Sequence, residues 1–552
     1  MIDHLDLNPE LLESESLVPE VSPDFPAILN VRGLYSTTEF VLRLSPRIHQ
    51  LIDAVPSGVY STDDLDAEII QAFSTYLHET VHWWQHIGST SGLILSLAYP
   101  GQAHQNSKHL AAVIERFGPK KSLIEWSEKA ALAGRSDVEL GPANSAVNNA
   151  IDVEFYKAIT LEPPRLRKLL DSAYFETMGH CYWMAYGHAV SLLSSTVDRE
   201  QKHPPDGRRW DDEFRRVRDA GIEGFTRGGP VRIAPFGLRA LFEGQARFQQ
   251  MQYLTFGIAN PPTCDELRKA GFFSGVYGEA FEGFLKVTLA QWPRTIDDPL
   301  VALFLLIVDL AINPTVGFPL DIASFENFII DVDPGIRFLR LCQAAVKHPA
   351  LLSTITEYSR REYLEAADVL TKACEYDHPA IALQTVAGWA TQSEGVAKIL
   401  AEKETFRYEP ENLVVRVLFS HFVSFCIDKL EHPEFFCWPG AWMAGLRVCD
   451  KSQELFLKYL SLYTDRADND GIFPREIPGK DPAAISQTLN IFYGNIVIYD
   501  LTRQWILEDG PFVYDFDWLS QTNSKTSMTE WAKGVFEKIY KVSPDAFEIL
   551  AP

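Results

Sequence analysis

His78, Glu79 and His82 have the types and the spacing of a zinc site, in the HExxH sequence His78-Glu79-Thr80-Val81-His82. On a helix, positions i and i+4 lie one turn apart on the same face, so both imidazoles can reach one metal ion. Glu79 then lies beside the coordination position that a catalytic zinc ion leaves open, where a carboxylate can act as a general base. The spacing therefore predicts a zinc-dependent hydrolase with His78 and His82 as metal ligands and Glu79 as the catalytic base.

The sequence around the motif favours a single helix. No Pro or Gly occurs from Ala67 to Ile87, and either residue type would break or weaken a helix. Acidic side chains, which favour the start of a helix, stand just before this run at Asp63, Asp64 and Asp66. The alternative interpretation is a buried helix whose charged residues are satisfied structurally, because a motif this short also arises by chance.

The motif and its neighbours resemble the zincin metallopeptidases. The longer zincin pattern requires uncharged residues around HExxH and an apolar residue two positions after the second histidine. The positions that match this pattern are Thr75, Tyr76, Thr80, Val81, Trp83 and Trp84. The resemblance implies hydrolysis of peptide bonds in a protein or peptide substrate. It also implies an edge strand beside the metal that holds an extended substrate by strand addition.

A catalytic zinc ion needs a third protein ligand, and Glu243 is the first candidate. In Glu243-Gly244-Gln245-Ala246, small residues follow the acid, so its helix can be expected to lie close against the motif helix. The stretch resembles the Glu-Gly-x-Ala segment that supplies the glutamate ligand in gluzincins. Glu243 lies farther from His82 than is usual in that group, so the resemblance implies a helical insertion between them.

Other residues compete for the third ligand position and for the stabilisation of the transition state. The alternative ligands are Glu154, Glu279 and the i, i+4 pair Glu176 and His180. For that pair the preferred interpretation is a satisfied polar seam, that is, polar side chains that hydrogen-bond to their neighbours within an aromatic core. His86, one turn after His82, is expected at the surface rather than as a partner of a ligand. The oxyanion also requires a hydrogen-bond donor. The candidates, among which the sequence does not choose, are Tyr186, His188, Tyr253 and Tyr277.

The composition indicates a globular protein and excludes several partners. The chain has 552 residues, of which 46% are hydrophobic, and this length is enough for two or more cores. A formal charge of −24 argues against a nucleic-acid partner, because binding phosphates requires a basic surface. The longest apolar run, Leu300 to Val308, is too short to span a bilayer, and the N-terminus lacks the apolar segment of a signal peptide. Seven scattered cysteines without a C-x-x-C motif suit reduced thiols, so a cytoplasmic protein without a membrane partner is expected.

The pattern along the chain predicts a mainly α fold in three parts. These are an N-terminal arm at 1–26, a zincin-like catalytic domain with a helical insertion at 27–335, and a large helical domain at 336–552. Apolar runs at 28–31 and 40–44 predict a small N-terminal β-sheet just before the motif helix. Long helices are expected at 172–197, 238–255 and 299–312, and loops at 134–145 and 464–482.

Two other functions compete with an active peptidase. One is a zincin-like scaffold or binding protein without catalytic activity, since the large helical second half could be a partner surface. The other is a di-iron carboxylate protein, because Glu79-x-x-His82 and Glu375-x-x-His378 are both ExxH pairs. Pro379 directly follows His378, which places that second pair at a helix end and disfavours the di-iron alternative. The long insertion and the helical second half also favour a peptidase that is restrained until a regulatory protein partner opens it.

Overall fold

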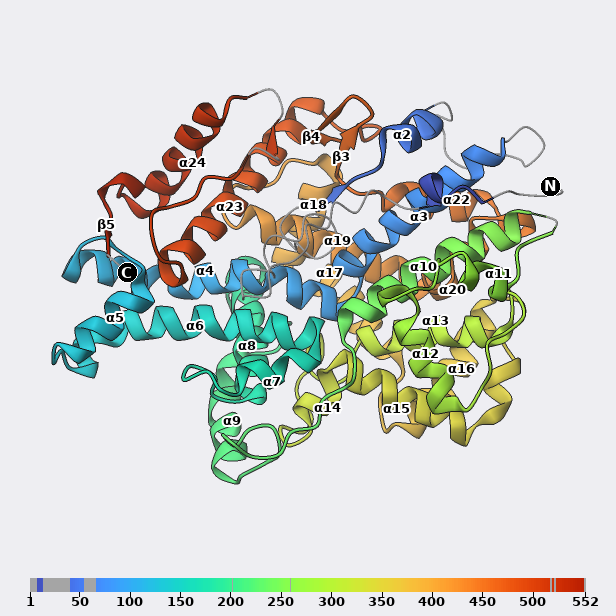
Figure 1. Cartoon of the computed structure of the whole chain (residues 1–552), viewed down its shortest axis with the longest axis horizontal. Coiled ribbons are helices and arrows are strands. Elements are labelled where there is room, and N and C mark those ends of the chain that lie inside the picture. The colour runs from blue at the N-terminus through green and yellow to red at the C-terminus, as the bar shows by residue number, and fades with distance from the viewer. Residues whose placement is uncertain are drawn as a thin grey trace.

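Helix α3 (Ala67–Gly88) contains the HExxH residues and is confirmed as one uninterrupted helix (Figure 1). The Asp66 side chain accepts a hydrogen bond from the backbone N–H of Glu68 and so caps the first turn. From Ile70 to Gly88 every residue except Glu79 is buried. This burial follows from the helices that pack on α3, which are α2 (Pro46–Asp53), α4 (Thr90–Phe117), α10 (Leu238–Gly257) and α19 (Leu413–Glu431).

The computed structural model describes residues 7–12, 40–53, 66–200, 202–258, 260–516, 519–520 and 523–550. The fold is mainly helical, as predicted, with 68% helix and 3% strand. The predicted strand at 28–31 and most of the predicted arm lie outside the described residues. The described part of the arm forms α1 (Pro9–Leu12), whose two leucines are buried, instead of an extended segment. Within the described ranges, no helix has both the length and the hydrophobicity needed to cross a membrane.

One group of helices packs around α4. Helices α6 (Asp137–Leu161) and α8 (Met178–Val197) lie against α4, and α5 (Leu123–Leu132) packs on α6. From the far end of the sequence, α23 (Pro482–Leu507) packs on both α5 and α6, and α24 (Lys525–Tyr540) packs on α23 (Figure 1). The last third of the chain therefore covers helices that come before residue 162.

A second group packs around α10 and lies below it in Figure 1. Helices α12 (Val276–Thr288), α13 (Pro299–Ile312) and α21 (Pro439–Trp442) contact α10, and α15 (Pro334–Lys347) contacts α12 and α13. The other α-helices are α7 (Leu166–Leu169), α9 (Trp210–Asp219), α11 (Cys264–Lys269), α14 (Phe328–Val332), α16 (Arg360–Ala373), α17 (Pro379–Gln392), α18 (Glu394–Thr405), α20 (Pro433–Cys437) and α22 (Asp450–Lys458). Helix α10 is thus held between α3 on one side and this second group on the other.

The three-stranded sheet differs from the predicted N-terminal sheet. Strand β1 (Val41–Leu42) pairs in parallel with β3 (Tyr463–Arg466), with Val41 opposite Tyr463, and β3 pairs antiparallel with β4 (Asn469–Pro474). Two of the three strands therefore come from a stretch that the sequence predicts to be a loop, and that prediction is wrong. A second, two-stranded sheet joins β2 (Lys120–Lys121) to β5 (Glu548–Ile549) in parallel.

Two helix boundaries also differ from the prediction. Helix α6 begins at Asp137, because Ser136 and Glu139 form a capping box in which each side chain bonds the backbone of the other residue. The predicted loop at 134–145 is therefore wrong beyond its first residues. Helix α8 begins at Met178, later than predicted, where the Thr177 side chain accepts a hydrogen bond from the backbone N–H of His180.

One continuous hydrophobic core joins the residues on both sides of position 335. Within it, Lys429 Nζ on α19 lies 2.5 Å from Asp309 Oδ1 on α13, and both side chains are buried. The Tyr363 hydroxyl on α16 donates to Asp309 Oδ2 at 3.0 Å. The boundary between 27–335 and 336–552 stays a prediction, and a buried ion pair crosses it.

Replacing Lys429 tests how strongly this ion pair stabilises the fold. Lys429→Met leaves the buried Asp309 carboxylate without its cation, so the free energy of unfolding should fall by about 3–5 kcal/mol. Lys372→Met, which removes an exposed lysine paired with Asp368, should change it by less than about 1 kcal/mol. Urea unfolding of the two variants measures the difference. Equal stability of the two variants would show that the buried pair does not stabilise the fold.

Candidate metal centre

The packing of α10 on α3 brings three predicted ligands together. His78 and His82 project from one face of α3, and Glu243 meets them from α10. Within the described residues, these three form the one group of at least three His, Cys, Asp or Glu side chains that could hold a metal ion. All three are buried, with 4%, 8% and 2% of their surfaces exposed for His78, His82 and Glu243.

The distances among the three ligand atoms suit one ion. His78 Nε2 and His82 Nε2 are 3.1 Å apart, and Glu243 Oε2 lies 3.7 Å and 3.5 Å from them. Neighbouring ligands of a tetrahedral zinc ion are separated by about 3.3 Å when each bond is about 2.0 Å. A triangle with the observed edges has a point about 2.0–2.1 Å from all three atoms, which is the usual bond length for these donors. The side chains therefore fit a bound ion without rearrangement.

The charges of the group also suit a divalent cation. Burial lowers the pKa of His78 well below its ordinary value, and the nearby His82 and Arg247 lower it further. Burial also acts to lower the pKa of His82, but the Glu243 carboxylate, with Glu79 and Gln85, outweighs this effect, so the pKa of His82 is raised. His78 thus offers a neutral ring, while Glu243 provides the negative charge that balances a cation in this buried place.

Gln85 orients His82. The His82 Nδ1–H donates to Gln85 Oε1 at 2.8 Å, so in the neutral ring Nε2 carries no proton and its lone pair is directed at the ligand triangle. The Gln85 amide is fixed in turn, because its Nε2 donates to the Phe242 carbonyl at 2.9 Å and to Gln245 Oε1 at 3.0 Å. One side chain of α3 therefore positions a ligand and bonds the backbone of α10 next to Glu243.

The small residues after Glu243 are expected from the sequence to face the motif helix, and for Gly244 this expectation is wrong. A Cβ atom added at Gly244 would meet Phe304 at 3.5 Å and Ala280 at 3.6 Å, so Gly244 faces α12 and α13 and not the motif helix. Larger side chains fill the contact with α3, since Gln245 accepts a hydrogen bond from Gln85 and the Phe242 ring packs on His86 at 5.8 Å between ring centroids. Glu243 itself lies where it was predicted.

Tyr277 is the predicted stabiliser that lies at the metal centre. Its ring centroid is 6.2 Å from that of His78, and the Arg247 guanidinium lies 4.1 Å from the Tyr277 ring centroid. Burial raises the pKa of Tyr277, Glu243 raises it further, and Arg247 acts in the opposite direction. The net increase keeps the phenol protonated at neutral pH, so it can donate a hydrogen bond.

The other predicted stabilisers lie elsewhere. Tyr186 packs on Tyr156 and Phe328, and Tyr253 packs on Phe73. His188 contacts Gly101 on α4, and burial together with the neighbouring His180 and His104 lowers the pKa of His188 to about 4.

Arg247 is a residue of the centre that the sequence analysis missed. It is buried and lies one helical turn after Glu243 on α10. Its Nη1 donates to the Leu12 carbonyl at 3.1 Å and to Gln250 Oε1 at 2.8 Å, which holds the guanidinium beside Tyr277. The i, i+4 spacing from Glu243 is the sequence signal that could have identified it.

The alternative third ligands have partners of their own. Glu154 accepts hydrogen bonds from Tyr99 and Arg503, both at 3.1 Å. His180 Nε2 lies 3.1 Å from Asp152 and 3.6 Å from Glu176, as expected of a satisfied polar seam. Glu279 lines a separate cavity with Glu162, between α10 and α12.

The predicted place of His86 is wrong, whereas that of His378 agrees with the structure. His86 is buried and contacts Ser96 at 3.2 Å, so its expected place at the surface is wrong. His378 is the N-cap of α17, where its Nδ1 accepts from the backbone N–H of Ala380, in agreement with its predicted place at a helix end. Glu375 precedes it with a left-handed φ of 61°, outside any helix. This second ExxH sequence therefore lacks the helical geometry of a di-iron ligand pair.

Metal analysis of two variants tests the centre. Glu243→Gln keeps the size of the third ligand but removes its charge, so the purified protein should lose most of its metal. Gln85→Leu removes the acceptor that orients His82 and should weaken metal affinity by about 10- to 100-fold. Elemental mass spectrometry and competition with a chelator measure these changes, with Glu282→Gln on the exposed face of α12 as the control. Wild-type metal content and affinity in both variants would contradict the assignment.

Comparison with known proteins yields no relative from which a function could be transferred. No protein-family model, no curated protein and no solved structure matches the chain. The geometry and chemistry of the residues around His78, His82 and Glu243 are therefore what indicates a function.

Proposed function

We propose that the chain is a zinc-dependent metallopeptidase that hydrolyses peptide bonds of a specific protein substrate. The observation that carries this proposal is the triangle of His78 Nε2, His82 Nε2 and Glu243 Oε2, with Glu79 beside it on α3. Two imidazoles and one carboxylate are the protein ligands of many catalytic zinc sites, and a tetrahedral ion held by three ligands keeps a fourth position for water or substrate.

Zinc held there would lower the pKa of a bound water to about 7 and polarise the substrate carbonyl. Glu79 is partly exposed, unlike the ligands, and it acts electrostatically on both His82 and Tyr277. In this proposal Glu79 takes the proton of the attacking water as a general base and passes it to the leaving amine. The Tyr277 hydroxyl is assigned to donate to the oxyanion, because its ring contacts His78 and its proton is retained.

The burial of the ligands supports a restrained enzyme. None of the three exposes more than 8% of its surface, so an extended polypeptide can reach them only after the surrounding residues move. Among the described strands, β1 lies at the edge of its sheet, and Phe40 before it packs on Trp83 of α3 at 5.6 Å between ring centroids. A substrate or regulatory protein that opens this region would give specific cleavage, whereas the isolated chain would turn over casein-like substrates slowly.

The Glu79→Gln variant tests the assignment of the base. It should keep one zinc ion per chain and lose about 10²- to 10⁴-fold of its activity, because the ligands are intact and the proton acceptor is gone. Proteomics of new N-termini in cells that express each form measures the loss, with Glu68→Gln in the exposed first turn of α3 as the control. Identical cleavage products from Glu79→Gln and wild type would remove Glu79 from the mechanism. No cleavage by wild type, with zinc bound, would favour the inactive zincin-like scaffold, and two irons per chain would favour the di-iron alternative.

Replacing Tyr277 tests the assignment of the hydrogen-bond donor. Tyr277→Phe removes one hydroxyl and keeps the ring that packs on His78 and Arg247. With a peptide that wild type cleaves, kcat should fall by about 10²- to 10³-fold while KM and zinc content stay the same. Tyr174→Phe, which removes a hydroxyl bonded to Glu128 outside the centre, should leave kcat unchanged. A normal kcat for Tyr277→Phe would show that its hydroxyl does not act on the oxyanion.

A further inference from the structure

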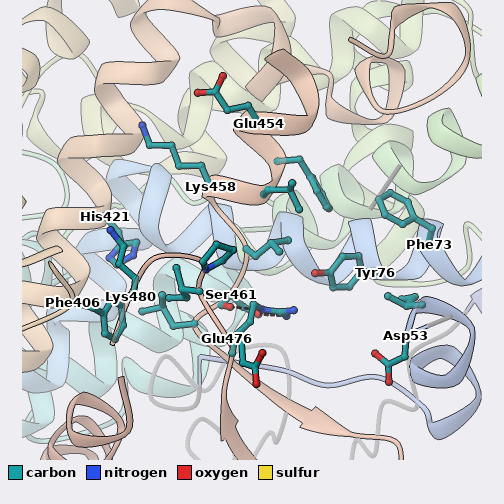
Figure 2. Close-up of a pocket in the computed structure, with 18 of the residues that line it drawn as sticks. Asp53, Phe73, Tyr76, Phe406, His421, Glu454, Lys458, Ser461, Glu476 and Lys480 are labelled. Atoms are coloured by element: carbon teal, nitrogen blue, oxygen red, sulfur yellow. Dashed lines mark hydrogen bonds between the residues drawn. The ribbon is translucent and has the colours of Figure 1, made fainter. Parts of the chain in front are cut away.

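A cavity of about 950 Å³ lies against α3, and Figure 2 shows Phe73 and Tyr76 among the residues that line it. On α3 it is lined by Ile69, Ile70, Phe73 and Tyr76, which recur at helical spacing. Residues of an α-helix advance by about 100° each, so Phe73 and Tyr76 lie roughly half a turn around the axis from His78 and His82. A volume of this size is within the range of about 300–1,000 Å³ that is typical of small-molecule sites.

One end of the cavity contains three lysines, and Glu404 and Glu454 line the cavity beside them. Lys403 at the end of α18, Lys458 at the end of α22 and Lys480 after β4 all line it, and Figure 2 shows Lys458 and Lys480 on the same side of the view as His421. Lys458 Nζ pairs with Asp428 at 2.7 Å, and Lys480 Nζ lies 3.4 Å from Glu404 Oε2. The three ammonium groups converge from separate elements of the chain.

Lys403 differs from the two lysines beside it. It is 8% exposed and, among the described residues, its ammonium group makes no hydrogen bond and no ion pair. Burial lowers its pKa to about 8, with repulsion from Lys458 and Lys480 as a further cause. Below that pH the group remains mostly cationic, and the two carboxylates that act on it, Glu404 and Asp428, also pair with Lys480 and Lys458, so Lys403 has no counter-charge of its own. An anion bound among the lysines would supply it.

The other end of the cavity is aromatic. Phe73 packs on Tyr76 and Phe456 with ring centroids 5.7 Å and 5.5 Å apart, and all three residues line the wall. Arg475 is held beside this wall, since its Nε donates to the Ser461 carbonyl at 2.8 Å and its guanidinium lies 5.8 Å from the Tyr76 ring centroid. In Figure 2, Phe73 and Tyr76 lie across the cavity from Lys458 and Lys480. A ligand that spans the cavity would therefore meet cations at one end and aromatic rings at the other.

We infer that this cavity binds a phosphate monoester of an apolar, ring-containing small molecule. Its phosphate lies among Lys403, Lys458 and Lys480, and its ring lies against Phe73 and Tyr76. Phosphate fits this end better than a carboxylate, because its three terminal oxygens can each accept a hydrogen bond from one of the three ammonium groups, two of which also pair with Asp428 and Glu404. Because α3 forms one wall of the cavity, the ligand would contact the same helix that carries His78 and His82. This inference goes beyond the proposed peptidase and does not depend on it, because none of its residues is a metal ligand.

Calorimetric titration with phenyl phosphate tests the inference. Phenyl phosphate should bind wild type at least about tenfold more tightly than inorganic phosphate or phenol, because only it meets both ends of the cavity. Lys403→Gln should weaken phenyl phosphate binding by about tenfold or more, since it removes one charge-assisted contact. Lys398→Gln is the matched control, because Lys398 lies on the same helix, pairs with Glu409 and does not line the cavity.

Several results would overturn this inference. One is that wild type does not bind phenyl phosphate at millimolar concentration. The others are that Lys403→Gln binds it as tightly as wild type, and that wild type binds inorganic phosphate as tightly as phenyl phosphate. Lys480→Gln provides a second variant in case Lys403→Gln does not fold, and it should also weaken binding. The metal content of both variants should equal that of wild type. A failure here therefore stays distinct from a failure of the zinc assignment.

Discussion

The packing of α10 along α3 is the interaction on which the metal centre depends. It brings Glu243 within 3.5 Å and 3.7 Å of two imidazoles that the helical spacing alone has already placed together. Gln85 fixes this contact, since one amide group both orients His82 and bonds the Phe242 carbonyl. A shift of α10 along α3 would separate the carboxylate from the histidines and break these hydrogen bonds at the same time.

Burying His78, His82 and Glu243 together is energetically costly when no cation is bound among them. Two imidazole nitrogens that face each other at 3.1 Å can share at most one proton, and the carboxylate beside them is 2% exposed. Buried charges in proteins are generally paired or bound to metals, because isolated ones are costly to remove from water. A bound divalent ion satisfies all three ligand atoms at once, so metal binding and the stability of the α3–α10 contact should be coupled. The low dielectric constant of this buried site would also strengthen the electrostatic interactions of Glu79 and Tyr277 with a reacting group.

The sequence predicts the centre better than it predicts the fold around it. The i, i+4 histidines lie in an uninterrupted helix, so local geometry alone places them, and the Glu-Gly-x-Ala resemblance identifies Glu243. Arg247 was missed because its i, i+4 spacing from Glu243 does not by itself distinguish a buried residue of the centre from an exposed ion pair on a helix surface. The zincin-like arrangement and the peptidase activity remain predictions.

Each error in the predicted fold has a physical cause. The stretch at 464–482 is polar and contains turn-forming residues, so it suggests a loop. Its strands form because β3 pairs with β1 and β4, and the pairing with β1 spans more than four hundred positions of sequence. At the start of α6, Gly141 and Pro142 suggest a loop, but the capping box at Ser136 and Glu139 starts the helix before them. Pairing between distant segments cannot be read from local periodicity, whereas the capping residues were visible in the sequence.

X-ray absorption at the zinc edge, on protein purified with one zinc ion per chain, tests the central claim most directly. Zinc bound by His78, His82 and Glu243 should show a first shell of nitrogen and oxygen at about 2.0–2.1 Å, with the outer-shell scattering of two imidazoles and no sulfur. In Glu243→Gln, this signal should weaken together with the zinc content. A sulfur shell near 2.3 Å, or a spectrum that is unchanged in both His82→Gln and Glu243→Gln, would contradict a metal centre formed by α3 and α10.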